Sequence, residues 1–213
     1  MTEADIPKIF DDREQIEAGV QIVRGLDVSD TPTLRQKVDS PGKQGVTLLV
    51  VAMGARNKTA MRRLLVMGAS PNQRTPDGES PVLLAAGADD REFIETLLRA
   101  GGNPNVRNVR NEPALFTAAT QRRWNNLYYM VDNGADVNAT DIGGNTILHY
   151  CAQVGQFEPI PALIERGANF QKANNHGRTL GDLVLSSRVN PASAQGAMRE
   201  KVRQILLARG AIR

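Results

Sequence analysis

Two short markers recur along this chain at a fixed interval of 33 residues. The first is a glycine-led turn, seen as GASPN at Gly68, GGNPN at Gly101, GADVN at Gly134 and GANFQ at Gly167. The second is a single position, held in turn by Gly45, Gly78, Asn111, Gly144 and Gly177. Because two independent markers keep phase, the sequence predicts an array of stacked repeats rather than one globular core.

Each unit can be interpreted physically, and the one around Gly78 is the simplest to follow. Gly78 suits a tight turn because glycine adopts positive φ at little cost. A first helix is predicted over 81–87, with small Ala85 and Ala86 where helices must approach closely. A second is predicted over 91–100, with apolar residues at helical spacing, and Gly101 ends it. One such unit cannot bury its apolar face alone, so we expect the units to stack.

Two segments carry a family resemblance. DIGGNTILHYCAQVGQFEPIPALIERGAN (141–169) and PDGESPVLLAAGADDREFIETLLRAGGNPN (76–105) resemble the ankyrin repeat, D-x-x-G-x-T-P-L-H-x-A-A followed by V-x-x-L-L-x-x-G-A-x-x-N. The resemblance covers residues 42–213. It implies an all-α ankyrin-repeat solenoid of stacked helix-turn-helix units with projecting β-turn fingers. The fingers and first helices would form its concave side.

The repeat spacing also predicts the domain boundaries. We expect an acidic N-terminal helix pair that acts as a cap (1–41), then repeats over 42–74, 75–107, 108–140 and 141–173, the third of them divergent. A C-terminal capping repeat would occupy 174–213. Gly210 follows Gly167 by 43 residues, ten beyond the period. This delay predicts a loop insertion near 188–198.

Charge and hydropathy narrow the possible partners. The formal net charge is +3, with nine acids and five bases in residues 1–40 and a basic C-terminal end. No run of five bases occurs, so a nucleic-acid partner is not expected. The longest apolar run, 46–53, is too short to cross a bilayer. The acidic start does not resemble a signal peptide. The compartment stays open: cytoplasmic for the chain as written, periplasmic if a leader has been removed.

Reactive side chains are few. His149 lies at the histidine position of the ankyrin motif, where the resemblance implies a structural residue that ties neighbouring turns together. Cys151 follows it by two residues, which places the two side chains on different faces of a helix. No phosphate-binding loop, dinucleotide fingerprint or metal-spaced cluster is present. We therefore expect no catalytic residue, no metal site, no cofactor and no enzyme activity.

Binding residues are expected where the repeat framework leaves positions variable, at the finger tips and on the exposed side of each first helix. These positions hold Lys43, Arg74, Asp77, Glu79, Arg107, Arg110, Glu112, Gln121, Asn145, His176 and Arg178. An arginine-lined face suits an acidic protein surface. The alternative is that the arginines bridge neighbouring fingers. His176 is either a turn residue or a partner contact.

The divergent stretch NVRNEPALFTAATQRRWNNLYY (108–129) adds Arg123, Trp124 and Tyr128 to this set. Tryptophan, tyrosine and arginine are the residue types richest in binding hot spots. Trp124 lies three residues before Leu127, so it fits either a core or a contact position. The adjacent Tyr128 and Tyr129 point about 100° apart on a helix, so we expect one at the surface.

These features predict a module that binds one partner protein through its concave face and fingers. The composition suggests a bacterial source. Small free-standing bacterial ankyrin proteins include immunity proteins, so one hypothesis is an immunity protein that inhibits a cognate secreted toxin or effector enzyme. The alternative is a host-directed effector or regulatory adaptor that recruits its partner without inhibiting it. A third hypothesis is a structural protein that assembles with itself.

Overall fold

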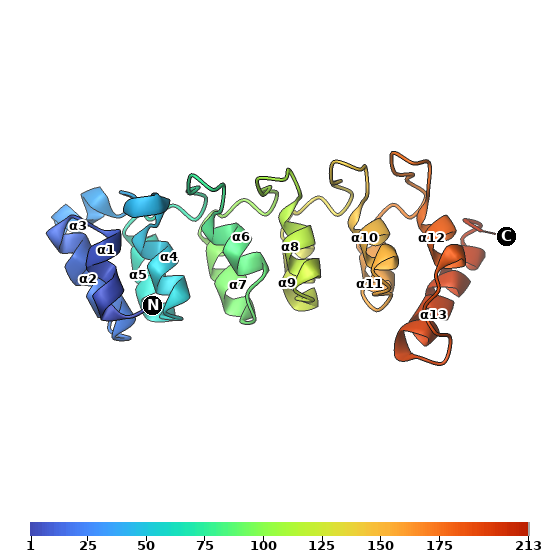
Figure 1. Cartoon of the computed structure of the whole chain (residues 1–213), viewed down its shortest axis with the longest axis horizontal. Helices are drawn as coiled ribbons and strands as arrows, with labels where there is room; N and C mark the ends of the chain where they lie inside the picture. The colour runs from blue at the N-terminus through green and yellow to red at the C-terminus, as the bar shows by residue number, and fades with distance from the viewer. Residues whose placement is uncertain (213) are drawn as a thin grey trace. The chain divides into compact units, whose positions relative to one another are not determined.

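The computed structural model describes residues 1–212, and the regular structure in this range is helical (Figure 1). The chain divides into two compact units, here called the N-terminal unit (residues 1–103) and the C-terminal unit (from Pro104 onward). An isolated bridge between Arg107 and Pro113 is the β-type pairing recorded for the described residues. The predicted all-α fold is confirmed.

The N-terminal unit begins with short helices and continues with two helix pairs. Its elements are η1 (Glu3–Asp5), α1 (Ile6–Ile9), α2 (Arg13–Val23), α3 (Pro32–Lys37), η2 (Lys43–Gly45), α4 (Leu48–Gly54), α5 (Lys58–Val66), α6 (Pro81–Ala86) and α7 (Arg91–Arg99). α2 packs against α4, so the first helices cover the open side of the α4–α5 pair. The repeat pattern did not predict α1. Its Ile6 is fully buried against Gly19, where a Cβ atom would lie 2.6 Å from the isoleucine.

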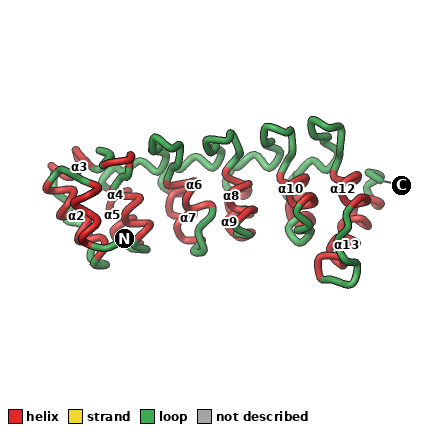
Figure 2. The backbone as a smooth tube through the Cα atoms, viewed as in Figure 1, coloured by secondary structure: helices red, strands yellow, loops and turns green. Residues whose placement is uncertain are grey.

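The C-terminal unit contains three helix pairs, shown with their connecting loops in Figure 2. The pairs are α8 (Ala114–Thr120) with α9 (Trp124–Asp132), α10 (Ile147–Gln153) with α11 (Ile160–Glu165), and α12 (Leu180–Ser186) with α13 (Ala194–Ala208). α10 packs between α8 and α12, and α11 packs against α13. Its core is aliphatic, with Leu127, Leu148 and Leu163 fully buried.

The insertion in the last repeat is only partly a loop. Residues 194–198, expected inside it, form the first turns of α13. The hydroxyl of Ser193 accepts a hydrogen bond from the Gly196 amide at 3.0 Å, and this cap starts the helix early. The predicted loop near 188–198 implied a later helix start, because the apolar pattern alone does not reveal this cap.

The finger of the divergent repeat keeps its backbone although Asn111 replaces glycine. Asn111 adopts φ +59°, close to +76° at Gly78 and +73° at Gly144. Asparagine tolerates this left-handed region better than most other non-glycine residues. What the divergent repeat lacks is a side-chain cap at the start of α8 or α9. The stretch is therefore an intact framework with altered helix ends.

His149 has the structural role that was predicted for it. Its Nδ1 accepts hydrogen bonds from the Thr146 amide (3.2 Å) and hydroxyl (2.8 Å). Its Nε2 donates to the carbonyl of Arg178 in the next finger, at 2.9 Å. The side chain is fully buried, and burial lowers its pKa. This arrangement requires the neutral imidazole, because a protonated Nδ1 could not accept.

We therefore expect stability to depend on pH through His149. Because the folded pKa is lowered, its contribution is fully present above the unfolded value of about 6.5 and is lost as pH falls through the folded value. His149→Gln should cost about 1–3 kcal/mol at pH 7.5. It should also flatten the fall in unfolding midpoint between pH 7.5 and pH 5, measured by urea titration.

His176→Gln is the matched control, because His176 is exposed at a finger tip. Its pH dependence should equal that of the unmodified chain. If the unfolding midpoint fell equally with pH in His149→Gln and in the unmodified chain, the role assigned to His149 would be contradicted.

Candidate functional site

The C-terminal unit carries three fingers of the same construction, at residues 107–112, 140–145 and 173–178. In each, the amide of the second residue donates to the carbonyl of the sixth: Asn108 to Glu112 at 3.0 Å, Asp141 to Asn145 at 3.0 Å and Asn174 to Arg178 at 2.9 Å. The side-chain oxygen of that second residue accepts hydrogen bonds from two further backbone amides of its own finger. Each finger is therefore a closed turn with little backbone freedom.

Neighbouring fingers in this unit are also joined to each other. The Arg107 guanidinium donates to the carbonyl of Asn111 in its own finger (2.6 Å) and to that of Thr140 in the next (2.9 Å). The Asn174 amide donates to Asn145 Oδ1 at 2.8 Å. For Arg107, the alternative that arginines bridge neighbouring fingers is confirmed. Glu112 likewise bonds inside its finger, through Asn108 at 2.7 Å.

An asparagine ladder fixes the spacing between these fingers. Asn105 donates to the Gly134 carbonyl at 2.9 Å and accepts from the Asp136 amide at 2.7 Å. Asn138 repeats the pair with Gly167 (3.2 Å) and Asn169 (2.7 Å). Asn72 makes the same two bonds within the N-terminal unit. Each asparagine thus satisfies backbone groups one repeat further on.

The finger tips present side chains that the framework does not use. Val109 is 70% exposed and Ile142 is 78% exposed, at equivalent positions of adjacent fingers. Arg110 and His176 are also exposed. The Arg110 guanidinium has no hydrogen-bond or ion-pair partner within residues 1–212. The predicted binding set includes neither Val109 nor Ile142, because charged and polar residues were favoured at the finger tips.

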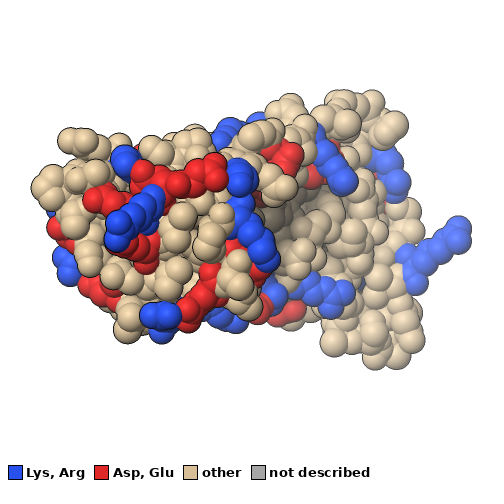
Figure 3. Space-filling view, turned by 60° about the vertical axis from the view of Figure 1, so that its left-hand side comes forward, with Lys and Arg blue, Asp and Glu red and all other residues tan. Residues whose placement is uncertain are grey.

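The predicted residues of the N-terminal unit lie at its own fingers. Lys43 pairs with Asp11 at 3.2 Å, the Arg74 guanidinium donates to the Gly78 carbonyl at 3.2 Å, and the Glu79 amide donates to Thr75. Asp77 is an exposed tip. Figure 3 shows acidic and basic side chains intermingled over this unit. Many of these charges are paired, so they form no continuous basic surface.

Gln121, Arg123, Trp124 and Tyr128 do not join the fingers. Gln121 follows α8 and Arg123 precedes α9, so both lie in the turn at the end of the helix pair away from its finger (Figure 1). Trp124 is half-buried, which is intermediate between the core and contact alternatives. One tyrosine was expected at the surface, and Tyr128 and Tyr129 are both half-buried, so each is partly accessible and neither lies in the core.

Tyr128 is held in a surface cluster on the second helix. The Arg166 guanidinium lies 4.8 Å from its ring centroid and pairs with Asp132 at 2.8 Å. Burial raises the pKa of Tyr128 to about 12. The cluster consists of mutually satisfied side chains, which fits a role in packing α9 against the following repeat.

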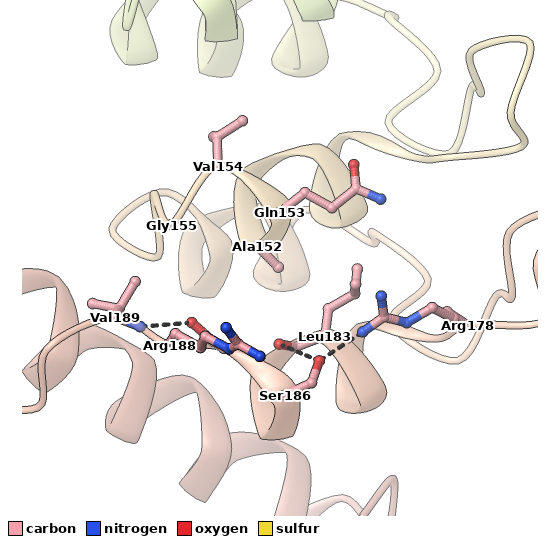
Figure 4. A pocket seen from close by; sticks show the side chains of 10 residues that line it. Ala152, Gln153, Val154, Gly155, Arg178, Leu183, Ser186, Arg188 and Val189 are labelled. Carbon is pink, nitrogen blue, oxygen red and sulfur yellow. Dashed lines mark hydrogen bonds between the residues drawn. The ribbon is translucent and has the colours of Figure 1, made fainter.

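A pocket of about 440 Å³ lies between the C-terminal ends of α10 and α12 (Figure 4). α10 and the turn after it contribute residues 152–155, and α12 and the loop after it contribute Leu183 and residues 186–189. Arg178 lines it from the finger side. Apart from Arg178, sequence reasoning missed this site. The one available signal was the insertion after α12, which supplies Arg188 and Val189.

The chain offers little reactive chemistry. Cys151 is fully buried, and burial raises the pKa of its thiol to about 12. Within residues 1–212, no group of three histidine, cysteine or acidic side chains is placed to hold a metal ion. In the same range, no helix has the length and apolar character needed to span a bilayer.

The family model for ankyrin repeats (3 copies) matches residues 48–141 and 82–174. Among curated proteins, SH3 and multiple ankyrin repeat domains protein 2 of Homo sapiens is 28% identical over 78% of this chain and 9% of its own length. Alpha-latroinsectotoxin-Lt1a of Latrodectus tredecimguttatus is 36% identical over 31% of this chain and 5% of its own length. Ankyrin repeat domain-containing protein 37 of Bos taurus is 35% identical over 28% of this chain and 38% of its own length. The matched part thus covers less than half of each relative.

The asparagine ladder generates a test of the framework that holds the fingers. Asn138→Ala should lower the free energy of unfolding by about 1–3 kcal/mol, because the Gly167 carbonyl and the Asn169 backbone amide both lose the side chain that binds them. The measurement is urea unfolding followed by circular dichroism.

Asn125→Ala is the matched control, since Asn125 is an exposed residue of α9. Its effect should stay within about 0.5 kcal/mol. The ladder would not be a main stabilising contact if the two variants unfolded at the same urea concentration.

Proposed function

Because this chain belongs to the ankyrin-repeat family, we propose that it is a non-enzymatic module that recognises one partner protein through the fingers and first helices of its C-terminal unit. Ankyrin repeats generally mediate protein–protein interaction, and proteins built from them are typically not enzymes. The finer parts of the proposal, namely the surface and the consequence of binding, rest on the geometry of the fingers.

One observation carries the choice of surface. Val109 and Ile142 stand exposed on adjacent fingers whose backbones are closed by hydrogen bonds and joined through Arg107. Exposed aliphatic side chains at the tips of such turns contribute little to folding. Burying each against a partner would contribute about 1.5–3 kcal/mol. The rigid fingers also lower the entropy lost on binding.

The charges beside these tips indicate the partner's chemistry. Arg110 flanks Val109 and is exposed, and His176 lies on the third finger. A partner surface with an apolar centre and an acidic rim would complement this arrangement. Arg107, Glu112 and Asn145 act in this proposal as positioning residues, because their side chains bond within or between fingers. Arg110 and the two aliphatic tips would make the contacts.

For the consequence of binding, we propose an immunity role. In that role the fingers cover the active site of a cognate secreted toxin or effector enzyme and inhibit it. The alternative is a host-directed effector or regulatory adaptor, whose partner stays active. The activity of a captured partner distinguishes the two: inhibition supports immunity, and unchanged activity supports an adaptor. Self-assembly predicts instead a multimer by light scattering of the purified chain.

The surface is tested by Val109→Asp combined with Ile142→Asp. We expect this variant to weaken binding of the captured partner by about 2–4 kcal/mol, because two buried apolar anchors are lost. Circular dichroism should show an unchanged unfolding midpoint, since both side chains are exposed. Binding is measured by isothermal titration calorimetry.

Val66→Asp is the matched control: Val66 is 72% exposed, on α5 of the N-terminal unit. Its affinity should equal that of the unmodified chain. Equal losses for the control and the double variant would show that the fingers are not the binding surface.

A further inference from the structure

The pocket between α10 and α12 has a basic side, because Arg178 stands where the three preceding repeats hold Glu79, Glu112 and Asn145. Arg178 Nη2 donates to Ser186 Oγ at 2.6 Å. One repeat earlier, the equivalent residues are Asn145 and Gln153, which make a neutral hydrogen bond of 3.1 Å. The last repeat thus keeps the contact but replaces a neutral amide by a guanidinium. Repeat architecture alone does not require this change.

Ser186 orients the guanidinium of Arg178 without neutralising it. The Ser186 hydroxyl donates its own proton to the Asp182 carbonyl at 2.7 Å, so it accepts from Arg178 with its lone pair. Arginine has five N–H donors in a planar fork. The bond to Ser186 uses one of them, so donors remain on a guanidinium that itself lines the pocket.

Arg188 brings a second positive charge into the same pocket. Figure 4 shows Arg178 and Arg188 extending into it from opposite sides. Arg188 is exposed, and its side chain has no hydrogen-bond or ion-pair partner within residues 1–212. It begins the loop after α12, and the bond from Arg199 to the Ser187 carbonyl (2.9 Å) holds the base of that loop. The insertion therefore places a cation opposite the finger.

The pocket lining itself holds no acidic side chain, although the Asp182 carboxylate, whose pKa is lowered by hydrogen bonds from Thr179, lies close enough to Arg178 for that positive charge to help lower it. The residues that line the pocket include two arginines and no aspartate or glutamate. The acid closest in the chain, Asp182, binds the amide of Thr179 at 2.7 Å and its hydroxyl at 2.8 Å. Arg199, which bonds to the loop, adds further positive charge beside the pocket. The pocket is therefore complementary to an anion.

The rest of the lining is mixed, because the aliphatic side chains of Ala152, Val154, Leu183 and Val189 share it with the polar residues Gln153, Ser186 and Ser187. A carboxylate on an aliphatic stem fits both parts, because arginine binds carboxylates in a bidentate manner and the stem can pack on the aliphatic lining. We infer that this pocket receives one carboxylate of the partner protein, either from a glutamate side chain of the partner or from the partner's C-terminus. This inference rests on the proposed binding function and adds a second anchor point to it.

The pocket can be tested without the partner. The probes for titration into the full chain are N-acetyl-glutamate N-methylamide, which carries a side-chain carboxylate, and N-acetyl-leucine, which carries a terminal one. Methyl NMR should show saturable shifts at Leu183 and Val189 with a dissociation constant in the millimolar range. Binding of either probe supports the inference, and the tighter one identifies the carboxylate source.

Substitution of an arginine tests whether the NMR shifts depend on the positive charges of the pocket. Arg188→Gln should weaken binding at least roughly tenfold, the factor expected when one charge-assisted contact is lost. Arg122→Gln is the matched control, because Arg122 is an exposed arginine in the turn between α8 and α9, outside the pocket and the proposed finger contacts, and this variant should bind the probe like the unmodified chain. Methyl signals away from the pocket should not move in either variant, which verifies that both remain folded.

Several results would overturn the inference: no saturable shift, equal binding of the neutral N-acetyl-glutamine N-methylamide, equal binding of inorganic phosphate, or unchanged affinity in Arg188→Gln. None of these results depends on the finger tips. The pocket can therefore fail while the finger surface still binds the partner. Conversely, loss of the finger surface in the Val109→Asp and Ile142→Asp test leaves the probe titration unaffected.

Discussion

The rest of this protein depends on a pair of hydrogen bonds made by the side-chain amide of one asparagine in each of three successive repeats, namely Asn72, Asn105 and Asn138. Asn105 and Asn138 each donate to a carbonyl and accept from an amide in the following repeat. Those backbone groups lie just past the end of a helix, where no helical partner exists for them. A repeat array has contacts only between neighbours, so this bond pair, together with the apolar packing between helix pairs, sets the spacing of successive repeats.

Regular spacing would allow the fingers to act together as the proposed binding surface. Each finger of the C-terminal unit is closed by its own hydrogen bonds and joined to the next through Arg107 or Asn174. The tips can then change without cost to the framework, and Val109 and Ile142 show this freedom. The same separation explains why His149 is a structural residue: its ring nitrogens are committed to Thr146 and to the next finger.

The features that distinguish this chain from a regular repeat array lie in two places, the divergent stretch 108–129 and the insertion after α12. In the divergent stretch, Asn111 preserves the turn, while α8 and α9 begin without side-chain caps. The aromatic residues at its other end belong to the second helix, where Tyr128 packs with Arg166. After α12, the insertion supplies Arg188 and Val189 to a pocket. Finger tips and pocket both lie in the C-terminal unit, which is where partner recognition is proposed.

The sequence by itself determined the all-α repeat fold and the turn position that Asn111 occupies, because these follow from local spacing and from backbone rules that act within one repeat. The structural role of His149 followed from the resemblance to the ankyrin motif. It did not determine α1, the start of α13 or the half-burial of both Tyr128 and Tyr129, since each depends on packing against residues distant in the chain or on a single capping hydroxyl. It left the arginines undecided between partner and finger contacts. Only the tertiary structure committed Arg107 to Thr140, left Arg110 exposed and brought Arg178 and Arg188 together, because side-chain partners across repeats are set by three-dimensional proximity that a periodic pattern does not encode.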